Sequence, residues 1–190
     1  MSKNERDRYM LKEEYKRFIG NTPEQYKLFW KIIFNAGLRI SEGLNLTVND
    51  ILWEENKLLI ATLKRKDHPV IPIIIPKDLI DELRIYIKES GSMWKNLEVC
   101  GRIWKYSRQY CWKMFKSICR KAKLNPKYSP HALRHSHGVM ISDLTNGNMV
   151  EIQRRLRHTS IKSTEFYVHC SEAKQRALAE KIEEYLNAID

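Results

Sequence analysis

Three short segments of the chain collect side chains that are suited to bind and attack a phosphate group. They read GLRISEGL at 37–44, SPHALRHSH at 129–137 and LRHTSIKSTEFYVH at 156–169. Arginine forks match phosphate oxygens, histidine exchanges protons near neutral pH, and a tyrosine hydroxyl becomes a nucleophile once its proton is removed. With one lysine from a charged segment at 64–68, the candidate residues are Arg39, Lys64, His131, Arg134, His158 and Tyr167.

The basic candidates suit the charge that develops when a phosphodiester is attacked. Attack at phosphorus adds negative charge to the non-bridging oxygens, and the guanidinium groups of Arg39 and Arg134 can bind those oxygens bidentately. His131 and Arg134 stand three residues apart, so they share one face of a predicted helix. His158 would donate a further hydrogen bond to a phosphate oxygen.

The remaining candidates suit the two proton transfers of such a reaction. A phenol has a pKa of about 10, so Tyr167 needs a base, and His131 is the candidate. The departing sugar alkoxide is strongly basic and needs a proton donor. Lys64 lies at the tip of a predicted hairpin and is suited to that role.

Helical periodicity dominates the elements that must position these residues. One helix is predicted from the capping residues Thr22 and Pro23 to the stop at Gly37. Ser129 and Pro130 open another, which ends near Gly147, and a shorter one follows from about Met149. A last helix begins near Ser171.

One region has the pattern of strands. Residues 57–63 and 70–75 are short runs of leucine and β-branched residues on either side of the charged segment, which predicts a β-hairpin or small sheet. Pro72 places the second run at a sheet edge. The predicted fold is therefore mainly α with a small antiparallel β-sheet.

A basic amphipathic helix is predicted from Ser107. Its exposed face carries Lys113, Lys116 and Arg120, and this face either is solvated or contacts a DNA backbone. The sequence leaves both interpretations open. The predicted buried stripe of this helix consists of Tyr110, Cys111, Met114, Phe115, Ile118 and Cys119.

Length and charge limit the classes of protein. The 190 residues suit one domain, and a net charge of +11 with a pI near 9.5 favours a polyanionic partner, nucleic acid first. No apolar run approaches the length of a membrane span, and the N-terminus lacks a signal-peptide core, which predicts a soluble cytoplasmic or nucleoid-associated protein. The four cysteines form no CxxC pair and are expected to be reduced.

In order and spacing, the motifs resemble those of the tyrosine recombinases, also called phage-type integrases. That family carries arginine in an A/GLRxSE context, a lysine in a β-hairpin, an HxLRH box and an LGHxxxxTTxxY ending. Here the corresponding segments are GLRISE, the Lys64 hairpin, HALRH and LRHTSIKSTEFY. The resemblance runs from about Leu11 to Tyr185.

This resemblance implies the catalytic domain of a site-specific DNA recombinase or integrase. Such an enzyme cleaves and rejoins double-stranded DNA through a 3′-phosphotyrosyl intermediate, without metal, ATP or another cofactor. Carried over position by position, the six candidate residues complete the family's catalytic set, with Tyr167 as the nucleophile. Recombination in this family ordinarily requires four protomers on two duplexes.

Two features depart from the family pattern. Arg157 stands where most members have glycine before the second histidine, and glycine enters the expected backbone turn more readily than arginine does. The family also usually carries a core-binding domain of about 100 residues ahead of the catalytic one. Residues 1–190 are therefore expected to be a single catalytic domain without that N-terminal domain, and 171–190 a helical tail that packs on its own domain or on a neighbouring protomer.

Three alternatives to recombination stay open. The chain could be a DNA-binding remnant or regulator that kept the fold, or an enzyme that relaxes DNA as type IB topoisomerases do. A metal-dependent nuclease could use His131 and His135, which share a helix face at i and i+4, but the carboxylate of an HExxH pattern is missing. His135 and His137 are expected to satisfy buried polar groups or to face solvent.

Overall fold

The computed structural model describes residues 8–61, 69–93 and 101–158, together with five single positions between 164 and 182. Lys64 lies outside the described residues, and so does most of the tail predicted at 171–190. In the described part, no helix is long and apolar enough to cross a membrane.

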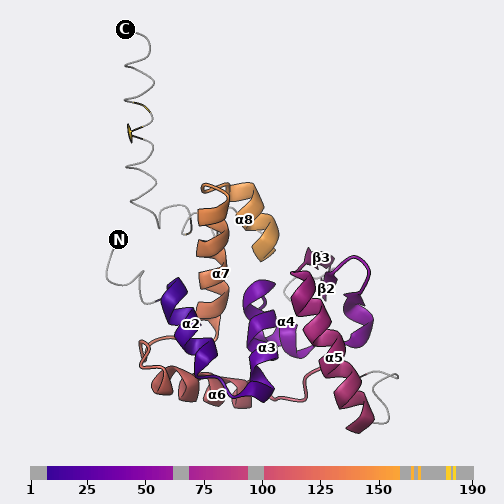
Figure 1. Ribbon diagram of the computed structural model, residues 1–190. Coiled ribbons are helices and arrows are strands. Elements are labelled where there is room, and N and C mark those ends of the chain that lie inside the picture. The colour runs from indigo at the N-terminus through magenta and orange to yellow at the C-terminus, as the bar shows by residue number, and fades with distance from the viewer. Residues whose placement is uncertain are drawn as a thin grey trace.

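The described chain is helical, with one small sheet (Figure 1). The sheet is antiparallel in the order β1 (Ile51–Leu52), β2 (Lys57–Ala61), β3 (Val70–Ile74), and Pro72 of the edge strand pairs with Leu59. The mainly α fold with a hairpin is thus confirmed, and the short first strand is an addition. The elements are α2 (Lys12–Gly20), α3 (Glu24–Asn35), α4 (Ile40–Leu44), the 3-10 helix η1 (Val48–Asp50), β1 (Ile51–Leu52), β2 (Lys57–Ala61), β3 (Val70–Ile74), α5 (Lys77–Met93), α6 (Arg108–Lys121), α7 (His131–Leu144) and α8 (Met149–Leu156).

Most of the predicted helix boundaries are confirmed. Ser107 caps α6 by accepting a hydrogen bond from the Tyr110 N–H, and Asn148 caps α8 in the same way. The prediction for Thr22 was wrong, because its hydroxyl donates to the carbonyl of Phe18 at the end of α2. It therefore closes the preceding helix and leaves α3 without a side-chain cap.

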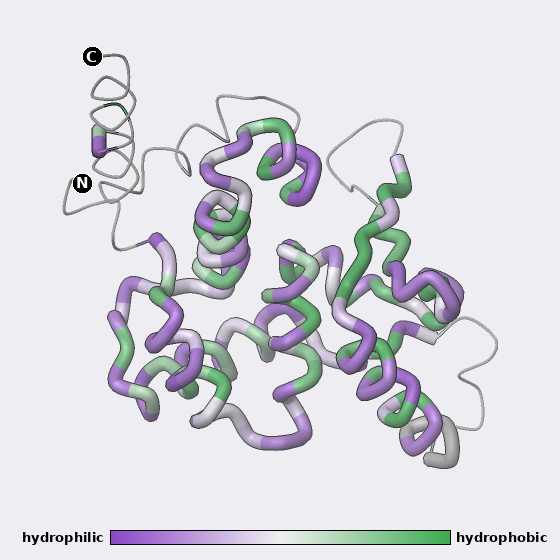
Figure 2. The backbone as a smooth tube through the Cα atoms, turned by 45° about the horizontal axis from the view of Figure 1, so that its top comes forward, coloured by the Kyte–Doolittle hydropathy of each residue, from purple (hydrophilic) through white to green (hydrophobic). Residues whose placement is uncertain are grey.

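The hydrophobic core is built around α3. Phe29, Trp30, Ile32 and Ile33 of that helix are fully buried, and Phe115 of α6 packs edge-on against Trp30. Figure 2 shows hydrophobic residues along the strands and on the inner helices. Helix α3 contacts α2, α4, α5 and α7. Its contact with α7 holds it against the helix that carries His131 and Arg134.

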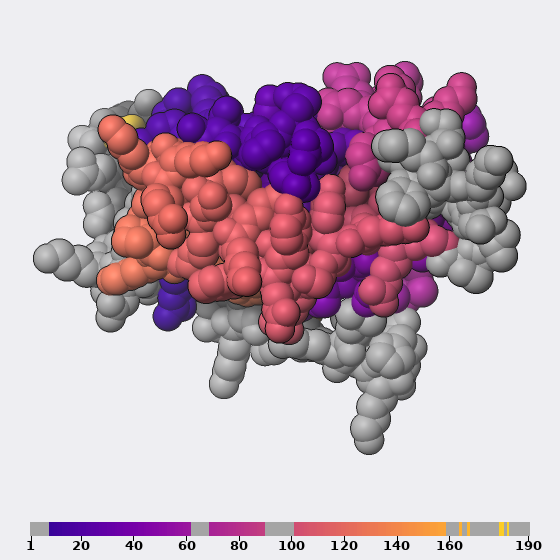
Figure 3. Space-filling model, turned by 90° about the horizontal axis from the view of Figure 1, so that it is seen from below, coloured from indigo at the N-terminus to yellow at the C-terminus, as the bar shows by residue number. Residues whose placement is uncertain are grey.

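Helix α6 lies across one end of this core, beside α2 and α3 (Figure 3). Five of its six predicted stripe residues are buried, but Tyr110 is 43% exposed and shares a hydrogen bond with the hydroxyl of Tyr26. Lys116 is half-buried, and its ammonium group donates to the carbonyls of Pro126 and Tyr128. Lys116 of the basic face therefore stabilises the segment that follows α6.

Candidate active site

Arg39 is positioned by the tight turn that joins α3 to α4. Gly37 lies in this turn with φ of +56°, and a Cβ there would approach the His137 ring to 2.6 Å. Glycine therefore meets both the conformational and the steric demand of the turn. The backbone N–H of Arg39 donates to Glu42 at 2.8 Å and so begins α4.

Arg134 projects from α7 into the interior, and its side chain is only 1% exposed. One terminal nitrogen donates to the carbonyl of Gly37 at 2.6 Å, and the other donates to the carbonyl of Leu156. Burial, followed by repulsion from Arg157 and Arg39, lowers the pKa of Arg134 to about 9, which leaves it charged at neutral pH. Arg134 thus ties the Arg39 turn to the end of α8.

The carboxylate of Glu42 lies at the centre of the arginines. Its oxygens accept hydrogen bonds from Arg39 at 2.6 Å and from Arg157 at 2.9 Å, and Arg134 lies 3.8 Å away. Burial by itself would raise the pKa of Glu42, but attraction to Arg157, the Arg39 hydrogen bonds and Arg134 together hold that pKa below its ordinary value. Glu42 is therefore charged at neutral pH and organises the cluster.

Tyr167 is buried against α7, with 2% of its surface exposed. A Cβ on Gly138 would come within 2.4 Å of the Tyr167 ring, so the ring lies directly on the glycine backbone. Ser142 of the same helix donates to the Tyr167 carbonyl at 2.8 Å. Helix α7 therefore holds both the ring and the backbone of the candidate nucleophile.

The hydroxyl of Tyr167 pairs with His135, at 2.8 Å from its Nδ1. Burial, followed by the charges of His131 and Arg134, lowers the pKa of His135 to about 3, so its ring is neutral at neutral pH. His131, one turn earlier, meets the His135 ring edge-on with centroids 4.5 Å apart. His135 was expected either to satisfy a buried polar group or to face solvent. The first expectation is confirmed, and the polar group is the Tyr167 hydroxyl.

His158 follows α8 and faces the same centre. Its ring centroid lies 6.1 Å from that of Tyr167, and its Nδ1 lies 3.3 Å from the hydroxyl of Thr164. Burial and then the charges of Arg134 and Arg39 lower the pKa of His158 to about 4. The neutral ring keeps an N–H that can donate to an anion.

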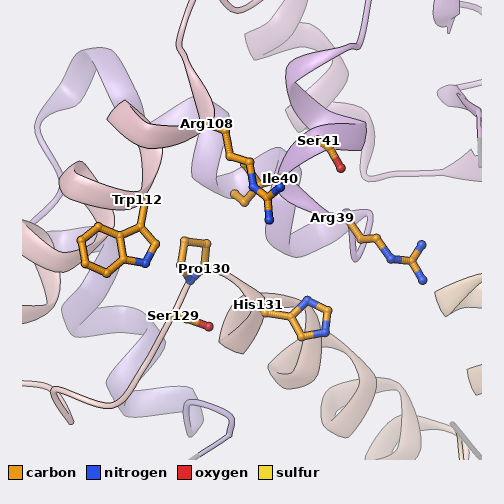
Figure 4. A pocket seen from close by; sticks show the side chains of 8 residues that line it. All are labelled: Arg39, Ile40, Ser41, Arg108, Trp112, Ser129, Pro130 and His131. Atoms are coloured by element: carbon orange, nitrogen blue, oxygen red, sulfur yellow. The ribbon is translucent and has the colours of Figure 1, made fainter. Parts of the chain in front are cut away.

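A pocket of about 480 Å³ opens between α4, α6 and the beginning of α7. Arg39 and His131 line it from one side, and Arg108 and Trp112 of α6 line it from the other (Figure 4). Arg108 and Trp112 belong to none of the three sequence motifs. The signal that could have found them was the Ser107 cap, which places both residues in the first turns of the basic helix.

His131 and His135 are the histidines that the sequence offered as metal ligands. In the parts of the chain that the structure describes, no three or more histidine, cysteine or acidic side chains are grouped to hold a metal ion. Their ring arrangement and the Tyr167 hydrogen bond give the two histidines other contacts.

Comparison with known proteins decides the family. Residues 8–174 match the phage integrase family. The chain belongs to this family. Among its relatives, the tyrosine recombinase XerA of Pyrococcus furiosus is 31% identical over 186 residues, covering 88% of this chain and 61% of the relative. XerH of Campylobacter jejuni is 28% identical over 190 residues, covering 93% of this chain and 52% of the relative.

Solved structures of integrase-family proteins share the fold. A crystal structure of XerA recombinase superposes with a TM-score of 0.73 at 22% identity, over 91% of this chain and 64% of that chain. The catalytic domain of bacteriophage HP1 integrase gives a TM-score of 0.66 at 18% identity, over 90% of this chain and 93% of that domain. The chain thus spans 61% and 52% of the two curated relatives but most of an isolated integrase catalytic domain.

In this integrase-family chain, four of the six motif residues lie in one connected region. Arg39 and Arg134 meet at Glu42, while His158 and Tyr167 face each other beside them. His131 borders the region and lines the pocket together with Arg39. The sixth residue, Lys64, lies outside the described residues.

Proposed function

We propose that this chain is the catalytic domain of a site-specific DNA recombinase that cleaves and rejoins strands through Tyr167. The observation that carries the proposal is the convergence of Tyr167 and His158 with two arginines that share one buried carboxylate. Such a centre offers a nucleophile and preorganised positive charge around one phosphate. The electropositive chain, with a net charge of +11, suits double-stranded DNA as the substrate.

In the proposed reaction, the scissile phosphate enters the pocket and meets the guanidinium of Arg39. The charge of Arg134, buried behind the turn, and the N–H of His158 add to the field at the non-bridging oxygens. These donors are fixed by protein hydrogen bonds before DNA arrives, so little reorganisation is needed as charge builds. The cluster therefore favours the transition state over the bound substrate.

Two proton transfers accompany attack. The Tyr167 oxygen forms a bond to phosphorus and loses its proton to His131, the proposed base, while His135 orients the hydroxyl beforehand. The bond from phosphorus to the 5′-oxygen of the leaving strand breaks, and Lys64 supplies the proton to that oxygen. The phosphodiester energy stays in the tyrosyl linkage, so rejoining needs no nucleotide cofactor.

Structures of two relatives bear on the partner. XerH has been crystallised with a difH substrate before cleavage and with a palindromic difH substrate after cleavage. Tn1549 integrase has been crystallised with transposon right end DNA. By likeness, we infer that duplex DNA lies against the pocket face of this chain, with further protomers completing the recombining assembly.

The proposal is tested with a nicked suicide substrate, in which cleavage releases a short fragment and traps the covalent adduct. Substrates drawn from the DNA flanking the native gene are incubated with the full chain and with Tyr167→Phe, in EDTA. We expect a denaturation-resistant adduct with the wild type alone. If no Tyr167-dependent adduct forms while DNA binding is intact, the chain is the DNA-binding remnant. If the protein relaxes supercoiled DNA without exchanging strands, the topoisomerase alternative is indicated.

A further inference from the structure

Arg157 occupies the place where the family pattern has glycine, and it points its side chain under the active site. We infer that Arg157 is a positioning residue, which holds Glu42 and through it Arg39 in the orientation that faces the scissile phosphate. The effect of Arg157 on cleavage rests on the proposed function. Its effect on the orientation of Arg39 can be measured without DNA.

The backbone of Arg157 is in a conformation that arginine seldom adopts. It ends α8 in the left-handed region, with φ of +54° and ψ of +41°, and its N–H donates to the carbonyl of Arg154. Glycine reaches this region without a steric penalty. The expected backbone turn is therefore present, and the arginine side chain must supply contacts that offset the unfavourable conformation.

The side chain supplies those contacts in one buried place. One terminal nitrogen donates to the carbonyls of Ala36 and Arg155, both at 3.1 Å. The other donates to the carbonyl of Gly37 and to a carboxylate oxygen of Glu42, both at 2.9 Å. The planar fork therefore bridges the end of α8, the Arg39 turn and the beginning of α4, which a lysine ammonium cannot do with the same geometry.

Glu42 passes this constraint to Arg39. One of its oxygens accepts from the Arg39 side chain, and the other accepts from the Arg39 backbone and from Arg157. Among the described residues, Glu42 is the side chain to which Arg39 is hydrogen-bonded. Arg157 therefore fixes the carboxylate that sets the direction of the Arg39 guanidinium.

Charge gives a second reason for an effect on the reaction. Arg39, Arg134 and Arg157 surround the single carboxylate of Glu42, so the cluster keeps an excess of positive charge. Without Arg157, Glu42 would neutralise a larger share of the charge that Arg39 and Arg134 offer to a phosphate. The field at the transition state would weaken.

Burial separates this role from DNA binding. The Arg157 side chain is fully buried, so it cannot contact a DNA backbone directly. Its loss should slow the chemical step and leave affinity nearly unchanged. A merely structural role would lower stability without affecting the cleavage rate of molecules that are folded.

The first test compares full-length variants in single-turnover cleavage of the suicide substrate at saturating DNA. Arg157→Gly keeps the left-handed turn and removes the side chain, Arg157→Lys keeps the charge, and Arg154→Ala removes an exposed arginine one turn away. We expect Arg157→Gly to cleave about 10- to 100-fold more slowly with unchanged Kd. Arg157→Lys should be intermediate, and Arg154→Ala should cleave at the wild-type rate.

Added methylguanidinium should restore part of the Arg157→Gly rate, since the small cation fits the vacated position, and should leave the wild type unaffected. A folded Arg157→Gly that cleaves at the wild-type rate, or one that loses only DNA affinity, would overturn the inference. If Arg157→Gly does not fold, the same measurements are made on Arg157→Lys.

The second test needs no activity. Arginine-selective 15N spectra of the full chain without DNA report rotation of the Arg39 guanidinium, with the signal assigned by its loss in Arg39→Lys. Slow rotation is expected in the wild type and fast, averaged signals in Arg157→Gly. An unchanged Arg39 signal would refute positioning, whereas a changed signal in a chain that forms no adduct would refute the proposed function and leave positioning standing.

Discussion

The phenolic oxygen of Tyr167 lies 2.8 Å from Nδ1 of His135 on α7, and neither residue is among those that line the pocket beside Arg39. Without DNA, the candidate nucleophile is thus held by a histidine outside the six-residue set. His135 is neutral, because burial and neighbouring charges lower its pKa to about 3. It can orient the hydroxyl but is a weak base, so the two histidines of the helix should differ in their effects.

Substitution of either histidine tests this division of roles. We expect His131→Ala to lower the single-turnover cleavage rate by about 10²- to 10⁴-fold, because a general base is lost. His135→Ala should lower it about tenfold, because only the orientation of the hydroxyl is lost. Quenched-flow cleavage assays measure both, and equal losses from the two substitutions would contradict the assignment.

Gly138 should be required for the placement of Tyr167. In Gly138→Ala the new methyl group would lie 2.4 Å from the ring, so the ring must move, at a cost of about 1–3 kcal/mol in stability. Adduct formation should fall more than the free energy of unfolding alone explains. Gly20→Ala is the matched control, since nothing lies within 4 Å of its Cβ, and it should be neutral in both assays.

Stability should fall as the pH is lowered from 7 to 5. The pKa values of His135 and His137 are about 3 and that of His158 is about 4, each lowered first by burial and then by nearby positive charge. The unfolded chain, with histidine pKa values of about 6.5, therefore binds more protons across this range, and His135 and His137 each contribute up to about 1.4 kcal/mol per pH unit. His158 contributes less, because it is more exposed and solvent screens its interactions.

Urea denaturation between pH 5 and 8 measures this dependence. His137→Gln should be less stable than the wild type at pH 7 and should show a shallower decline toward pH 5. In Glu42→Gln the decline over this range should persist, because a carboxylate with a lowered pKa loses its stabilising charge only at still lower pH. A His137→Gln curve parallel to that of the wild type would show that His137 does not remain neutral.

Arg108 should contact the DNA backbone. It lines the pocket opposite Arg39, so Arg108→Ala should weaken binding similarly for all sequences and reduce the slope of log K against log salt by about 1. Fluorescence anisotropy at several salt concentrations provides the measurement. Arg120→Ala, at the other end of α6, is the control that removes one positive charge away from the pocket. An equal change in slope for both variants would indicate an effect of net charge and not a local contact of Arg108.

The sequence predicted the parts of this site that depend on local order. The GLRISE and HALRH motifs located Arg39 and Arg134, and the helices predicted from Ser107 and from about Met149 correspond to α6 and α8. The pairing of Glu42 with Arg157 could not be predicted, because 115 positions separate the two residues and the packing of α4 on α3, α3 on α7 and α7 on α8 brings them together. His135 was missed as the partner of Tyr167 because 32 positions separate the two residues and a half-buried histidine has no distinctive pattern in sequence.

Mass spectrometry of the trapped DNA adduct is the most direct test that Tyr167 is the nucleophile of a phosphate centre. After nuclease and protease digestion of the wild-type adduct, we expect one peptide to carry a nucleotide phosphate on Tyr167, and none to carry it after Arg39→Ala or Arg134→Ala. A nucleotide on another residue, or cleavage products that carry no protein, would contradict the account.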